Sequence, residues 1–109
     1  MTRHVRELAV SSPQDDGQPY LFDLAINDED KIKGQSYTFG LHGHFTGAHV
    51  YPFYMDGRGN IDFGIYGGGE RMRSTNLHHR LVRVGELFTI KDGHKETSYK
   101  ITRIDPLHF

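Results

Sequence analysis

The chain has 109 residues, 36% of them hydrophobic, and a formal net charge of −1 with its eight histidines neutral. Cysteine is absent, which excludes disulfides, thiolate metal ligands and thiol nucleophiles. No stretch approaches the roughly 20 apolar residues of a membrane-spanning helix, and no apolar run follows the N-terminus as in a secretory signal. We therefore expect one domain over residues 1–109, in the cytoplasm and without membrane association.

Charge is unevenly distributed along the chain. Residues 1–30 hold seven carboxylates and two arginines, whereas residues 56–84 hold five arginines and three carboxylates. The isoelectric point of about 6.7 is far from the strongly basic values typical of nucleic-acid-binding modules. This pattern favours an anionic or oppositely charged partner, including a second copy of the chain, over nucleic acid.

Alternating apolar and polar residues recur along the chain, and no 12-residue window carries a clean helical stripe. In chain order, strands are expected at residues 4–10, 20–26 and 36–45, followed by a central hairpin, a strand at 80–85 and a C-terminal hairpin. Turn-forming polar and glycine residues separate these segments. About seven short, mostly antiparallel strands predict an all-β fold, either a small single-domain barrel or a compact sandwich.

The central hairpin is expected at residues 51–66, with a Gly-rich turn between its strands. Pairing Met55 with Ile61 also places Phe53 opposite Phe63. This register gathers the apolar side chains of both strands on one face, which is how a half-buried hairpin selects its pairing.

Two further elements are expected in the last third of the chain. One short helical turn should follow Ser74 or Thr75, either of which would cap it. In the C-terminal hairpin, Gly93 suits the first central position of a type II′ turn. That turn pairs Lys91 with Glu96, so that opposite charges face each other across the strands.

Three histidines, His42, His44 and His49, lie within eight residues and form the nearest approach to a chemical motif. Imidazole is the commonest metal ligand and titrates closest to neutral pH. His42 and His44 share one face of the expected strand, because residues two apart do so. Whether His49 joins them depends on the following loop.

Two loop lengths lead to opposite outcomes for this cluster. A two-residue turn pairs His44 with His49 and gathers the imidazoles, but it places Phe53 on the polar side of the neighbouring strand. A three-residue loop pairs Phe45 with His49, matches apolar residues throughout and separates the histidines. Because the buried face sets the register in a one-sided sheet, we expect the second arrangement; the first requires a closed barrel with both faces buried.

His42-x-His44 followed by His49 and then Gly57 resembles part of the first metal motif of the cupins. The resemblance implies two histidines and a carboxylate, with a further histidine from a later strand, around a divalent metal inside a β-barrel. The sequence departs from the motif, because His49 stands in the position of the carboxylate and the second motif is absent. A zinc or iron site at His42, His44 and His49 is therefore the alternative, and otherwise no cofactor is expected.

A Gly-rich and basic segment at residues 67–83 is the expected contact region. No Lys-Ser/Thr pair follows Gly67–Gly69, so the segment is not a nucleotide-binding loop. Long loops on a rigid β scaffold commonly carry recognition. The predicted partner-binding residues are Arg71, Arg73, His78, His79, Arg80 and Arg83.

These features predict a small soluble, non-catalytic binding module that recognises a protein partner or an anionic ligand. The sequence contains no convincing hydrolase triad, which argues against an enzyme. The first alternative is a histidine-liganded metal-binding barrel with an activity of its own. The second is a nucleic-acid-binding module in which Tyr54 and Tyr66 stack on bases.

Overall fold

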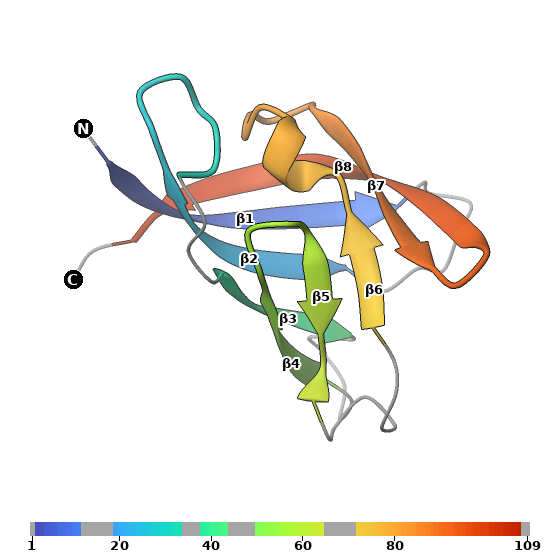
Figure 1. Cartoon of the computed structure of the whole chain (residues 1–109). Helices are drawn as coiled ribbons and strands as arrows, with labels where there is room; N and C mark the ends of the chain where they lie inside the picture. The colour runs from blue at the N-terminus through green and yellow to red at the C-terminus, as the bar shows by residue number, and fades with distance from the viewer. Residues whose placement is uncertain (1, 12–18, 34–37, 44–49, 65–71, 108–109) are drawn as a thin grey trace.

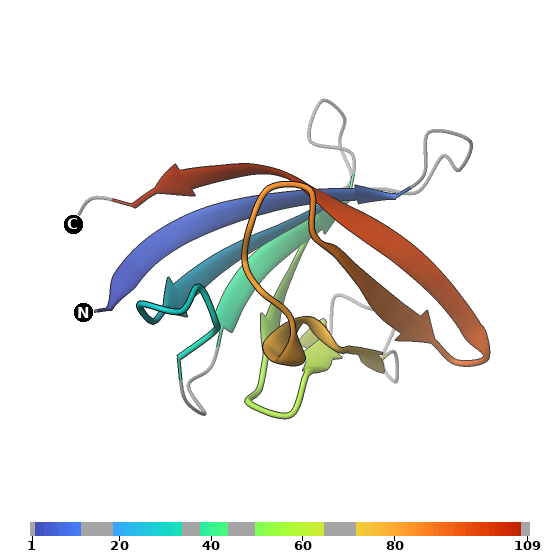
Figure 2. The ribbon, with the colours of Figure 1, turned by 90° about the horizontal axis from the view of Figure 1, so that it is seen from above.

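The computed structural model describes residues 2–11, 19–33, 38–43, 50–64 and 72–107. Within them, eight antiparallel strands pair in sequence order and β8 returns to β1, closing a barrel. Figures 1 and 2 show the sheet curving back on itself, with the two termini at the same end. The strands are β1 (Arg3–Ser11), β2 (Tyr20–Ile26), β3 (Thr38–Gly43), β4 (Val50–Met55), β5 (Asn60–Asp62), β6 (Met72–Thr75), β7 (Leu87–Asp92) and β8 (Lys95–Pro106). The all-β prediction is confirmed, and its barrel form is the one adopted.

Aromatic side chains fill the barrel. On β2 the inward positions alternate strictly, so that Tyr20 and Phe22 are both buried while their outward neighbours are not. The Phe22 ring centroid lies 5.3 Å from that of Phe53 and 6.0 Å from that of Phe88. An eight-stranded barrel is just wide enough to be filled by side chains, and these rings supply the large buried area that a small core needs.

Both predicted hairpins are present. Met55 pairs with Ile61 in the β4–β5 hairpin, as expected. Phe53 and Phe63 are buried with their ring centroids 5.6 Å apart. In the β7–β8 hairpin Lys91 pairs with Glu96, also as expected. Turn chemistry and alternation were sufficient to predict these registers because both hairpins are local in sequence.

The β3–β4 register corrects the expected one. His42 pairs with Tyr51 and Gly40 with Phe53, which is the pairing that follows from the shorter turn. A Cβ on Gly40 would lie 2.4 Å from Phe53 Cζ, so the Phe53 ring occupies space that only glycine leaves free. The strand consequently turns its polar side inward: His42 is buried, whereas Phe39 is 65% exposed. The barrel interior takes the polar side of β3 and the side that carries Phe39 faces outward, so the assumption that the more apolar side of this strand is the buried one does not hold.

The predicted strand at 80–85 is wrong. This segment is a loop that follows a single 3-10 turn, η2 (Leu77–His79). Val82 is buried, and its N–H donates to the carbonyl of Asp30 at 2.6 Å, so the loop covers one end of the barrel. The predicted helical turn is confirmed, but its N-cap is Asn76, which makes no side-chain capping bond, and not Ser74 or Thr75 as expected. Thr75 Oγ1 accepts a hydrogen bond from the Leu77 N–H at 3.2 Å. None of the described residues forms a helix long and apolar enough to cross a membrane.

Candidate functional site

The predicted partner-binding arginines that the structure describes do not share one surface. Arg80 Nε donates to the carbonyl of Leu87 at 3.0 Å and lies 3.6 Å from a carboxylate oxygen of Glu86. Arg83 Nε donates to Asp30 at 2.8 Å. Both arginines therefore hold the loop of residues 80–86 against the barrel. Arg71 lies outside the described residues.

Arg73 lies inside the barrel, at the end where β2 and β6 begin. Its guanidinium donates to the hydroxyl of Tyr20 and to His42 Nε2, the latter at 3.1 Å. Its Cζ lies 5.0 Å from the centroid of the Phe63 ring, a cation–π distance. Asp92 supplies the opposite charge, with its Oδ2 3.5 Å from Nη2 of Arg73. Only 16% of the Arg73 side chain is exposed, so this arginine organises the interior rather than an outer surface.

His42 is held between two groups that fix its tautomer. Nδ1 lies 3.1 Å from the carbonyl of Pro19, which can only accept, and Nε2 lies 3.1 Å from Arg73, which can only donate. The ring is therefore neutral with its proton on Nδ1. It also stacks on Tyr20 with centroids 3.8 Å apart. Of the predicted metal ligands, His44 and His49 lie outside the described residues, and the described ones contain no group of three metal-ligating side chains.

A second buried ionisable group lies in the middle of β1. Glu7 is fully buried, and it pairs with Phe22 on one side and with Ile104 on the other. Neither carboxylate oxygen has a hydrogen-bond partner. Burial raises the pKa of Glu7 from 4.5 to about 8, so the group is protonated at neutral pH.

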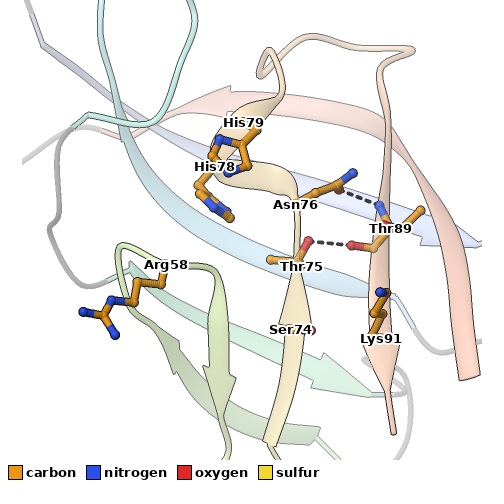
Figure 3. A pocket seen from close by; sticks show the side chains of 8 residues that line it. All are labelled: Arg58, Ser74, Thr75, Asn76, His78, His79, Thr89 and Lys91. Atoms are coloured by element: carbon orange, nitrogen blue, oxygen red, sulfur yellow. Dashed lines mark hydrogen bonds between the residues drawn. The ribbon is translucent and has the colours of Figure 1, made fainter. Parts of the chain in front are cut away.

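A basic hollow of about 340 Å³ opens beside β6 (Figure 3). It brings together three segments that are distant in sequence: the β4–β5 turn, the end of β6 with η2, and the outer side of β7. Figure 3 shows Arg58 and Lys91 on opposite sides of Thr75, with His78 and His79 above it. We call this feature the basic hollow; its lining residues are Arg58, Ser74, Thr75, Asn76, His78, His79, Thr89 and Lys91.

The floor of the basic hollow is held by hydrogen bonds between β6 and β7. Thr75 Oγ1 donates to the carbonyl of Thr89 at 2.7 Å, and the Thr89 N–H donates to Asn76 Oδ1 at 2.8 Å. These bonds continue the strand pairing past the end of β6. Because Asn76 Oδ1 already accepts a hydrogen bond, the side-chain NH2 group of Asn76 is the donor that it can offer to a ligand.

Two adjacent histidines form the upper wall of the basic hollow. The ring centroids of His78 and His79 lie 3.9 Å apart. His78 is half-buried and His79 is exposed. Burial, followed by the proximity of His79, lowers the pKa of His78, against smaller opposing effects of the Thr75 carbonyl and Asp56. His78 is therefore neutral at pH 7.

The cations at the rims of the basic hollow are not paired. Among the described arginines, Arg58 is the one that makes no ion pair, and Lys91 makes none either. None of the described residues that line the hollow is a carboxylate. Asp56, in the turn beside Arg58, accepts three hydrogen bonds, from the N–H groups of Arg58 and Asn60 and from the Asn60 side chain. The described residues of the hollow therefore carry an excess of positive charge, with Asp56 beside them as the opposing group.

Sequence reasoning found His78 and His79 but missed Arg58 and Lys91. In the sequence, Arg58 resembles an ordinary turn residue because it lies between two glycines. Lys91 resembles an ordinary charged residue at the end of a hairpin strand. Only the closure of the barrel places these residues around one hollow. Compared with known proteins, the chain matches no family model, no curated protein and no solved structure.

Proposed function

We propose that this protein is a non-catalytic binding module that takes up a small anionic ligand in the basic hollow. One observation carries the proposal: Arg58 and Lys91 form no salt bridge and lie at the rims of a hollow whose described lining residues include no carboxylate. The other six described arginines have carboxylate partners. Arg58, which forms no salt bridge, thus differs from the other described arginines.

The chemistry of the lining suits an oxyanion. An arginine fork donates two bonds at once to a carboxylate or phosphate, and a lysine ammonium adds a point charge. Ser74 and the Asn76 amide supply neutral donors between them. The volume of about 340 Å³ is at the lower end of the range for small-ligand pockets, so the expected ligand is small.

Binding is tested by titrating the purified protein with inorganic phosphate, pyrophosphate and succinate in an isothermal calorimeter. We expect saturable binding of at least one of them, weakened by added salt because exposed charges are screened. Arg58→Gln and Lys91→Gln should each weaken it several-fold. Lys100→Gln is the matched control, since Lys100 is an exposed lysine on β8 outside the hollow.

The proposal is wrong if none of the three anions binds, or if Lys100→Gln weakens binding as much as Lys91→Gln does. The second outcome would mean that only the net charge of the protein matters. A saturable site sensitive to Arg58 and Lys91 alone supports the basic hollow.

A histidine-liganded metal site is the second candidate, and one observation favours it. The β3–β4 register within the described residues is the one on which a site at His42, His44 and His49 depends. Against it, both ring nitrogens of His42 are engaged, and the guanidinium of Arg73 faces the nitrogen that a metal would need. A cation placed there would have to displace another cation, so anion binding at the basic hollow is the preferred function.

A further inference from the structure

We propose that the ligand of the basic hollow is a doubly charged oxyanion of the phosphate class, and that its binding is coupled to proton uptake by the His78–His79 pair. This inference rests on the proposed function and concerns the same site. It names the class of ligand and the condition that regulates its binding.

The imidazole rings of His78 and His79 lie against each other. With ring centroids 3.9 Å apart, the two imidazoles cannot both be charged without a strong mutual repulsion. His79 is exposed, whereas His78 is set into the wall with its Nδ1 buried and without a hydrogen-bond partner. Mutual repulsion therefore limits the pair to one added proton, and the charged groups around it decide how readily that proton is held.

The charged groups around the His78–His79 pair are mainly positive. The β4–β5 turn presents Arg58, and β7 presents Lys91, both positive. The opposing group is Asp56, whose carboxylate is already the acceptor for three N–H groups of its own turn. The net surroundings thus oppose protonation of the pair. An oxyanion placed in the hollow reverses the sign of that field and favours protonation.

The number of charges selects the class of ligand. Arg58 and Lys91 supply two positive charges before any histidine is protonated. A monocarboxylate neutralises only one of them, whereas a phosphate ester carries between one and a half and two negative charges at pH 7. A dianion can therefore pair with both Arg58 and Lys91, and its negative charge also stabilises an imidazolium beside it. Its three acceptor oxygens also match donors arriving from three separate segments.

Sulfate is the decisive probe, because it remains a dianion across the whole pH range used and any proton taken up must bind to the protein. Calorimetric titrations with sodium sulfate at pH 6, 7 and 8, in two buffers of different ionisation enthalpy, report the number of protons taken up. We expect uptake approaching one proton and an affinity that rises up to about tenfold per pH unit on acidification. Inorganic phosphate and glycerol phosphate are then compared at pH 7 to distinguish a free ion from an ester.

Two substitutions locate the proton. The double variant His78→Gln/His79→Gln should abolish the proton uptake, while weak sulfate binding through Arg58 and Lys91 remains. His79→Gln alone changes an exposed side chain and leaves His78 to accept the proton, so it should change the amount of uptake at a given pH without abolishing it. His94→Gln is the control, because His94 is exposed in the β7–β8 turn and does not line the hollow.

The possible outcomes separate the two proposals. If no anion binds at any pH, the proposed function itself fails. If sulfate binds with the same affinity at pH 6 and 8, or if uptake persists in the double variant His78→Gln/His79→Gln, the proton coupling is wrong while the anion site stands. If acetate binds as tightly as sulfate, the restriction to dianions is wrong.

Discussion

The imidazole of His78 lies directly on Gly59, with no room for a side chain between them. A Cβ on Gly59 would lie 2.6 Å from His78 Cε1 and 2.2 Å from the carbonyl oxygen of Thr75. The two segments are also joined by a hydrogen bond of 2.8 Å from the Thr75 N–H to the Gly59 carbonyl. This contact holds the β4–β5 turn, and with it Arg58, against the wall of the basic hollow.

Gly59→Ala should therefore destabilise the protein by more than about 2 kcal/mol. The Cβ overpacks a contact with backbone, and φ is +86° at this position, in the left-handed region. Urea unfolding measures the loss. Gly85→Ala is the matched control: its φ is +92°, but nothing lies within 4 Å of its Cβ, so only the backbone penalty of about 1 kcal/mol applies. Equal losses in the two variants would show that the contact with His78 does not matter.

Glu7 should make the stability of the barrel fall as pH rises. Its pKa in the folded protein is about 8, against 4.5 in the unfolded chain, so the folded state keeps a proton that the unfolded state releases. The stabilisation is fully present below pH 4.5 and is lost as pH rises to about 8, in total on the order of 5 kcal/mol.

The test compares urea unfolding of the wild type and Glu7→Gln between pH 4.5 and 9. Glutamine has nearly the same shape and no charge, so the stability of the variant relative to wild type should rise across this window. Glu96→Gln, at an exposed position on β8, should change nothing comparable. A wild-type and a Glu7→Gln curve that run parallel would contradict burial of an unpaired carboxyl.

Arg73→Lys should cost about 1–2 kcal/mol, although it keeps the positive charge. A lysine ammonium cannot bond Tyr20 and His42 in the same fork while it lies over the Phe63 ring, so buried acceptors lose their partner. Arg103→Lys, at a position that is 69% exposed and paired with Asp105, should cost no more than about 0.5 kcal/mol. Thermal or urea unfolding would show the difference, and similar losses at both positions would mean that the interior cluster contributes little.

Added zinc should leave the melting temperature unchanged, because His42 presents no free ring nitrogen to a metal. Elemental analysis before and after chelation is the direct measurement. Near-stoichiometric zinc or iron that disappears in His44→Ala, together with a chelation-sensitive melting temperature, would overturn this expectation and restore the metal-binding alternative.

Local pattern in the sequence determined most of the strands and the two tight hairpins, but it placed a strand at residues 80–85 that is absent and missed β6. The pairing of Met55 with Ile61 and that of Lys91 with Glu96 follow from alternation and turn chemistry within about fifteen residues, where the chain has few other ways to match its apolar faces. The same reasoning failed at β3, where Phe39 reads as core and is 65% exposed. The deciding contact there is between Gly40 and Phe53, and no local pattern contains it.

The sequence by itself therefore determined the class of fold, the short helical turn after Thr75 and the histidines beside it. Only the tertiary structure decided that the barrel closes, that Glu7, His42 and Arg73 face its interior, and that Arg58 and Lys91 meet at one hollow. The physical reason is that alternation specifies two faces of a strand without saying which is buried. In a closed barrel the answer is set by packing between strands that are far apart in sequence.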